Sequence, residues 1–212
     1  MTSTIIEKLQ WRYATKKFDP SKKLSEEKLN ILKESFNLTA TSFGLQPLKL
    51  VVVSNAETKQ QLMPFTYNQP QVRDASQVLI LCIEERIDEN FIVDHFKRVE
   101  GTRKTPREVL EPFEKNMIDS FTEKDSSEIK DWMINQLYLT LGALLTVCAV
   151  EKIDACPMEG FQPEKYDDFL GLDKMGLKSV IVLPVGYRDE SDFFKKLKKV
   201  RRGVDELTLE FK

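Results

Sequence analysis

The longest helical pattern in the sequence, from Ser126 to Val150, constrains the fold more than any other feature. Its apolar residues recur at helical spacing, for example at Ile129, Trp132 and Leu137, and its second half carries few polar side chains. A helix that is apolar nearly all round has to be buried on every side. In a chain of 212 residues, the second burying surface is commonly another subunit, so this pattern indicates a dimer.

Composition excludes several classes of protein. Lys and Arg total 32 against 34 Asp and Glu, so no overall charge draws the protein to nucleic acid or anionic lipid. The 3 cysteines form no C-x-x-C pair, which fits a reducing cytoplasm. We find no signal peptide and no apolar run near the roughly 18 residues that cross a bilayer. We therefore expect residues 1–212 to form one soluble, cytoplasmic domain with no membrane partner.

Short apolar runs rich in β-branched residues predict buried strands at Leu48 to Val53, Val78 to Ile83 and Ser179 to Val185. Helical spacing and capping residues predict several helices, at Thr2 to Arg12 with Thr2 or Ser3 as cap, after Ser25, at Glu57 to Met63, and in part of Asp88 to Asp125. Helices that alternate with a few strands give an α+β or α/β sandwich.

The chain ends with a pattern typical of a strand. From Glu206 to Phe211, the residues Leu207, Leu209 and Phe211 alternate with polar residues. This tail follows the last core strand and a basic run, so it suits the edge of a partner's sheet as well as its own.

The side chains alone support little chemistry. His95 is the single histidine, so an imidazole base, a Ser-His-Asp triad and a multi-histidine metal site are poorly supported, and we expect His95 on the surface. The 8 glycines form neither a G-x-x-x-x-G-K loop nor a G-x-G-x-x-G turn. If the protein is an enzyme, a cofactor has to supply the difficult step.

Two basic clusters stand far apart in the sequence, Arg12 to Phe18 near the start and Lys195 to Arg202 near the end. Each alone is typical of a solvated charged face, and the second also of a nucleic-acid patch. The net charge of -2 and the lack of interleaved aromatics in the second cluster weigh against nucleic acid. An isolated phosphate held by converging Arg and Lys side chains is the more economical explanation.

The order of motifs along the chain resembles the nitroreductase family, most closely its oxygen-insensitive bacterial nitroreductase and flavin reductase branch. The motifs are WRYATKKFDPSKKL from Trp11, GLQPLKLVVV from Gly44, the stretch from Asn68 to Ser76, QLYLTLGALL from Gln136, PMEGF from Pro157 and SVIVLPVGYR from Ser179. Each motif is moderately specific by itself. Their shared order and spacing make the resemblance strong, and it runs nearly end to end.

The resemblance implies an α+β fold with a central, mostly antiparallel sheet flanked by helices. It implies an intertwined homodimer with the C-terminal arm exchanged onto the partner, FMN as cofactor, NADH or NADPH as electron donor, and no metal. The FMN-binding residues it implies are Arg12, Tyr13, Ala14, Lys16, Ala40, Thr41, Ser42, Gly44, Asn68, Gln71, Gln136, Pro157, Met158, Glu159, Gly160, Lys199 and Arg201.

The resemblance also implies a role for each group of residues. Arg12, Lys199 and Arg201 would hold the flavin phosphate, which gives both basic clusters one purpose. Lys16 would stabilise negative charge near N1 and O2 of the reduced ring, and the backbone amide of Glu159 would face N5. No side chain would be catalytic beyond this tuning of the flavin.

The resemblance also assigns the remaining positions, and at some positions this chain carries a residue that is unusual for the branch. Asn68 would bond the pyrimidine edge, and Gln136 would lie near the ribityl chain. The other subunit would supply Ala40, Thr41, Ser42 and Gly44. Departures from the residues usual in the branch occur at Tyr13, Ala14, Gly44 and Gln71.

The function implied is transfer of electrons from NAD(P)H, through flavin N5, to small acceptors such as nitroaromatics, quinones, flavins or pteridines, in a two-step (ping-pong) mechanism. One alternative is an FMN-binding store or sensor with little turnover. Another is a dimeric, basic-tailed binding protein without flavin. The sequence does not choose the acceptor or the nicotinamide.

Overall fold

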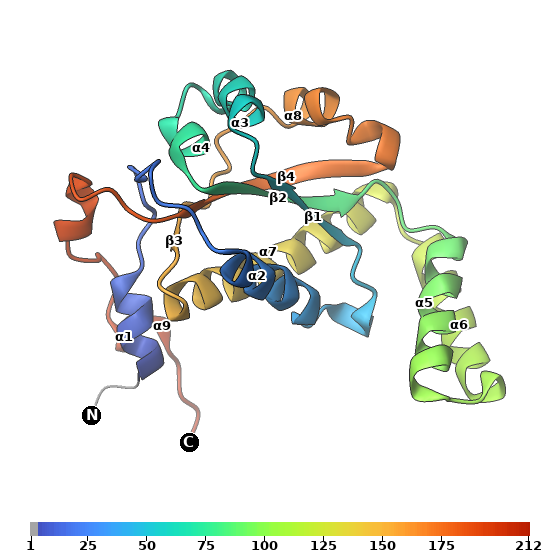
Figure 1. The fold of residues 1–212 in the computed structure, drawn as a ribbon. Helices are drawn as coiled ribbons and strands as arrows, with labels where there is room; N and C mark the ends of the chain where they lie inside the picture. The colour runs from blue at the N-terminus through green and yellow to red at the C-terminus, as the bar shows by residue number, and fades with distance from the viewer. Residues whose placement is uncertain (1–3) are drawn as a thin grey trace.

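The computed structural model describes residues 4–212 and is built around one antiparallel sheet (Figure 1). Its strands are β1 (Leu48–Val53), β2 (Gln77–Glu84), β3 (Asp154–Ala155) and β4 (Leu177–Gly186), in the order β1-β2-β4-β3. Every pairing within this sheet is antiparallel. The three predicted strands and the mostly antiparallel sheet are confirmed, whereas the two-residue strand β3 was not predicted.

The alternating side chains of the sheet feed two separate cores. On one face Leu79, Leu81 and Leu183 pack with α7 (Ser126–Val150) and α2 (Glu26–Leu38). On the other face Ile80 and Val182 pack with α3 (Ala56–Leu62), α4 (Pro70–Asp74) and α8 (Pro163–Leu170). The sheet is therefore a central layer between helices, as Figure 1 shows. The predicted α+β class is confirmed.

The bounds of α7 coincide with the predicted helix. Asp125 precedes it, and the Asp125 amide donates to the Glu128 side chain at 3.1 Å, which satisfies a free group at the helix start. An 18-residue window of α7 has a mean hydropathy of 1.7, so by length and composition the helix could cross a membrane. This corrects our expectation that no apolar run approaches that length. The inner side of α7 lies in the core, and a buried core helix passes the same test.

The other predicted helices are present with small shifts. Ser25 caps α2 by accepting from the Lys28 amide at 3.2 Å, as predicted. The helix α1 spans Thr4–Trp11, and its predicted caps Thr2 and Ser3 lie outside the described residues. The stretch from Asp88 to Asp125, which was predicted to be helical in part, forms a hairpin of α5 (Glu89–Arg103) and α6 (Arg107–Thr122). This hairpin extends from one end of the molecule (Figure 1).

The predicted C-terminal strand is wrong for the single chain. Val204–Leu207 form a helical turn, α9, and residues 208–212 have no regular structure. The Glu206 side chain accepts from the Gly203 amide at 2.8 Å, a contact that favours the start of a helix. A strand needs a neighbour for its backbone groups, and no strand of the described chain lies beside this tail. Leu209 and Phe211 remain 87% and 97% exposed.

The end of β4 brings the start of the chain onto the sheet. Phe18 and Arg188 form an antiparallel bridge, and the Asp19 amide donates to Tyr187 O at 2.8 Å. Between these segments, a Cβ at Gly186 would lie 2.9 Å from the Ser76 backbone nitrogen. Only glycine therefore fits this crossing without moving the backbone.

We predict that Gly186→Ala lowers the free energy of unfolding by about 1–3 kcal/mol, because a backbone atom cannot swing away as a side chain can. Gly101→Ala is the matched control, since a Cβ there meets nothing within 4 Å. Gly101 lies inside α5, so its replacement should raise stability by roughly 0.5–1 kcal/mol. Urea unfolding measures both, and equal effects of the two substitutions would contradict the crossing as described.

Candidate functional site

The two basic clusters meet in the folded chain. Lys199 Nζ donates to the backbone oxygen of Arg12, across 187 residues of sequence. A cavity of about 320 Å³ opens between the two clusters, and its lining residues are Arg12, Tyr13, Ala14, Lys16, Phe194, Leu197, Lys198, Lys199 and Arg201. We call Arg12, Lys16, Lys199 and Arg201 the cation cluster. The sequence prediction that these residues converge is confirmed by this geometry.

One buried carboxylate, Asp192, joins the two clusters. Its Oδ2 accepts from the Lys16 amide at 2.9 Å, the Lys17 amide at 3.1 Å and the Tyr13 hydroxyl at 3.0 Å. Its Oδ1 accepts from the Phe194 amide at 2.9 Å. Burial opposes ionisation of Asp192, but these hydrogen bonds outweigh it and lower the pKa of its carboxyl. Asp192 thus fixes the first basic segment against the second.

A second pair, the partly buried Arg188 and the buried Asp154, lies against the first basic segment. Arg188 donates to Asp154 through Nε at 2.6 Å and through its amide at 2.8 Å. Its guanidinium also lies 4.1 Å from the ring centroid of Trp11 and 4.6 Å from that of Tyr13. Arg188 is therefore occupied by protein groups, and it supports the segment that carries Arg12 instead of offering a free charge.

The cations of this cluster are not paired with carboxylates in the described part of the chain. Within residues 4–212, none of its four members forms an ion pair with Asp or Glu. Burial, and then the charges of Arg12, Arg201 and Arg188, lower the pKa of Lys199. Burial is also the largest cause that lowers the pKa of Arg12, and Arg201 adds to it. A bound anion would relieve this repulsion, so the arrangement suits a phosphate.

The loop from Pro157 to Phe161 lies beside the cation cluster. The Thr15 amide donates to Ala155 O at 3.3 Å, which sets the start of this loop against the first basic segment. Met158 exchanges two hydrogen bonds with Val182, of 2.8 and 3.1 Å. In the described part of the chain, the amides of Glu159 and Gly160 donate to no acceptor. Both residues are exposed, so two donors remain open to a ligand.

Asn68 and Gln71 lie near this loop through their neighbour Gln69, whose Nε2 donates to Gly160 O at 3.1 Å. Asn68 is exposed and has a positive φ of 58°, the conformation of a turn residue. Gln71 is 6% exposed, and its Oε1 has no hydrogen-bond partner among the described residues. A buried amide oxygen of this kind is costly unless a ligand or water satisfies it.

The residues expected from a second subunit stay apart from the cation cluster in the single chain. Gln136 Oε1 accepts from the Ser42 amide at 2.8 Å, and Gly44 lies next to the half-buried His95. No hydrogen bond or ion pair between described residues links Ala40, Thr41, Ser42, Gly44 or Gln136 to the cation cluster. One chain therefore carries two parts of the predicted site and does not join them.

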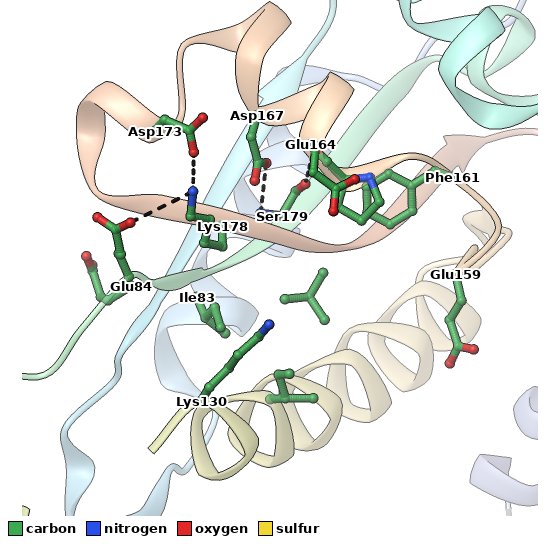
Figure 2. Close-up of a pocket in the computed structure, with 14 residues that line it drawn as sticks. Ile83, Glu84, Lys130, Glu159, Phe161, Glu164, Asp167, Asp173, Lys178 and Ser179 are labelled. Carbon is green, nitrogen blue, oxygen red and sulfur yellow. Dashed lines mark hydrogen bonds and ion pairs between the residues drawn. The ribbon is translucent and has the colours of Figure 1, made fainter. Parts of the chain in front are cut away.

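A larger cavity lies elsewhere. It measures about 550 Å³ and lies between α7, α8 and the start of β4 (Figure 2). Six carboxylates line it against the two cations Lys130 and Lys178, and Lys178 is paired with Asp173. Glu159 stands at its rim on the side of α7. The excess of carboxylates makes this cavity unsuitable for a phosphate.

Comparisons with known proteins agree with the fold and the order of the motifs. A model of the nitroreductase family matches residues 9–187. The oxygen-insensitive NAD(P)H nitroreductase of Salmonella typhimurium is 32% identical over 206 residues, 92% of this chain and 93% of that protein. The major NAD(P)H-flavin oxidoreductase of Aliivibrio fischeri is 31% identical over 216 residues, 98% of each chain.

Solved structures confirm the fold. A protein from Exiguobacterium sibiricum, assigned as a nitroreductase and solved in complex with FMN, superposes with a TM-score of 0.84 at 21% identity. The superposition covers 100% of this chain and 99% of that one. The whole described chain therefore has the architecture expected from its motifs.

We predict that Asp192→Ala lowers the free energy of unfolding at pH 7 by about 2–3 kcal/mol, because three backbone amides and the Tyr13 hydroxyl lose a charged acceptor. The folded-state pKa of Asp192 is lowered. Its contribution is therefore present above the usual aspartate pKa of about 3.9, and it is lost as the pH falls through the lower folded value. Asp131→Asn, at an exposed position on α7, is the control and should change stability by less than about 0.5 kcal/mol. Urea unfolding between pH 7 and pH 3 should show the wild type and Asp192→Ala converging, and a constant gap would contradict the assignment.

Proposed function

The chain belongs to the nitroreductase family, and we propose that it is an FMN-dependent oxidoreductase that passes electrons from NADH or NADPH to small organic acceptors. The observation that carries the proposal is the cation cluster, in which the half-buried Arg12 and the exposed Lys16, Lys199 and Arg201 line one cavity and form no ion pair with a carboxylate among residues 4–212. A relative at 31% identity is named an NAD(P)H-flavin oxidoreductase, which agrees with a flavin here.

The residues present fit FMN. Arg12, Lys199 and Arg201 would hold its phosphate by charge-assisted hydrogen bonds, and the Arg side chains can bind two oxygens at once. The open amides of Glu159 and Gly160 would serve the ring, and the unsatisfied Gln71 oxygen suits a donor on its edge. No metal is needed for this chemistry, and the described residues contain no group of three metal-binding side chains.

The mechanism assigns the difficult chemistry to the cofactor. When bound, FMN supplies hydride exchange through its N5 atom. Lys16 would provide a positive charge for the ring, the Glu159 amide would provide a hydrogen bond, and the rest of the site would orient the donor and the acceptor. Donor and acceptor occupy the same place in turn, so we expect double-displacement kinetics. Nitroaromatics, quinones, flavins and pteridines are the acceptor classes that such an open site admits.

We further propose a homodimer, with residues 1–212 of each copy forming one FMN-binding domain. An apolar hollow of about 540 Å³ on α7 supports this, because Leu139 and Val147 line it together with Ala40. Burying it against a second copy would bring Ala40, Thr41, Ser42 and Gly44 to the partner's cation cluster. Exchange of the C-terminal arm would cover its exposed Leu209 and Phe211 with the partner subunit. The balanced charge weighs against nucleic-acid and membrane partners, and the three free cysteines fit a cytoplasmic enzyme.

We predict that Arg12→Gln and Arg201→Gln each weaken FMN binding about 10- to 100-fold, since each removes charge-assisted hydrogen bonds to phosphate. Riboflavin has the same ring without the phosphate, so its dissociation constant should change little. Lys33→Gln, at an exposed position on α2, is the control. Flavin fluorescence titration measures all of these affinities. Equal loss of FMN and riboflavin affinity in the arginine variants would contradict the phosphate site.

The functional test is anaerobic reduction of the purified protein. Yellow protein with about one FMN per chain that bleaches on addition of NADH or NADPH supports the proposed enzyme. Yellow protein that does not bleach would indicate an FMN store, and colourless protein that takes up no added FMN would exclude both.

The departure at Gln71 gives a separate prediction. Gln71→Lys adds a cation beside the expected flavin pyrimidine ring, so it should raise the reduction potential of bound FMN. Gln61→Lys adds the same charge at an exposed position on α3 and is the control. Redox titration compares the variants. A potential that stays unchanged or falls in Gln71→Lys would overturn the expected position of Gln71.

A further inference from the structure

A side chain outside the predicted site contacts the loop that offers the free amides. Tyr138 on α7 donates a hydrogen bond to Glu159 Oε1, with an O···O distance of 2.5 Å. The hydrogen bond to Glu159, and then burial, raise the pKa of Tyr138 to about 12, so its hydroxyl remains a donor at neutral pH. This contact joins the long core helix to the Glu159 side chain.

The backbone around Glu159 is fixed by hydrogen bonds on either side of it. Met158 O accepts from the Val182 amide at 3.1 Å, and the planar peptide then directs the Glu159 amide to the opposite side, away from β4. Further along, Gly160 O accepts from Gln69. Glu159 itself is exposed. Within residues 4–212, its side chain makes one hydrogen bond, which is the contact with Tyr138.

Without the hydroxyl of Tyr138, the Glu159 side chain would regain rotamer freedom. The backbone hydrogen bonds of Met158 O and Glu159 O would then hold the peptide between Met158 and Glu159 alone, so the direction of the Glu159 amide would be less well fixed. Preorganised donors bind better than mobile ones, because no ordering is needed when the ligand arrives.

We propose that Tyr138 is a positioning residue, which fixes the Glu159 amide toward the flavin ring by holding the Glu159 carboxylate on α7. This inference rests on the proposed function. Tyr138 would contact neither the phosphate nor the ring of FMN and would act only through Glu159.

The test is Tyr138→Phe, which removes the hydroxyl and keeps the ring. N5 of oxidised FMN accepts a hydrogen bond, whereas N5 of reduced FMN carries its own hydrogen. The variant should therefore bind oxidised FMN about tenfold more weakly, with little change for the reduced form. The reduction potential of bound FMN then rises by about 30 mV, the tenfold equivalent for a two-electron couple. Fluorescence titration and redox titration measure the two effects.

The control and a second background separate this role from simple packing. Tyr187→Phe removes a hydroxyl that makes no hydrogen bond within the described chain, and it should leave both quantities unchanged. In a Glu159→Ala background, Tyr138→Phe should have no further effect. The inference would be wrong if Tyr138→Phe had the same effect in both backgrounds, or if it left FMN affinity and reduction potential unchanged; the proposed function would still stand. A wild-type protein that binds no FMN would contradict both the inference and the proposed function.

Discussion

Four hydrogen bonds to the carboxylate of Asp192 hold the two ends of this chain together. Three come from the segment Tyr13 to Lys17 and one from the segment that begins the second basic cluster. A charged acceptor that is 3% exposed and fully bonded is a strong local constraint. It holds the backbone of the first basic cluster against the segment that leads into the second, so the phosphate site depends on it.

Repulsion within the cation cluster destabilises the folded chain, and the rest of the fold must offset this loss of stability. Like charges lie close together there, and burial and repulsion lower the pKa of Lys199. Stability comes instead from the two cores on either side of the sheet and from the Arg188 and Asp154 pair beneath the site. A binding site that is unfavourable without its ligand favours tight binding of an anion, because the ligand removes the repulsion.

Much of this arrangement could be predicted from the sequence, since it depends on local patterns. The bounds of α7, the cap at Ser25 and the three long strands all follow from periodicity and capping chemistry. Asp192 was missed because a lone aspartate in a charged stretch gives no sign of burial, and three of its four hydrogen bonds come from residues 175 or more positions away in the sequence. The strand predicted at the C-terminus was wrong, because an alternating pattern of apolar residues does not supply the neighbouring strand that a β-strand needs. Tyr138 was missed because a tyrosine on an apolar helix is usually a packing residue.

The ionisation of bound FMN tests the central claim, that the cation cluster holds one phosphate, most directly. A phosphate monoester in water takes up a proton with a pKa of about 6. Around Arg12, Lys199 and Arg201 the dianion should be favoured, so phosphorus NMR of the complex should show an unchanged phosphate signal from pH 8 down to below pH 6. A bound phosphate that titrates near its ordinary pKa would contradict the account.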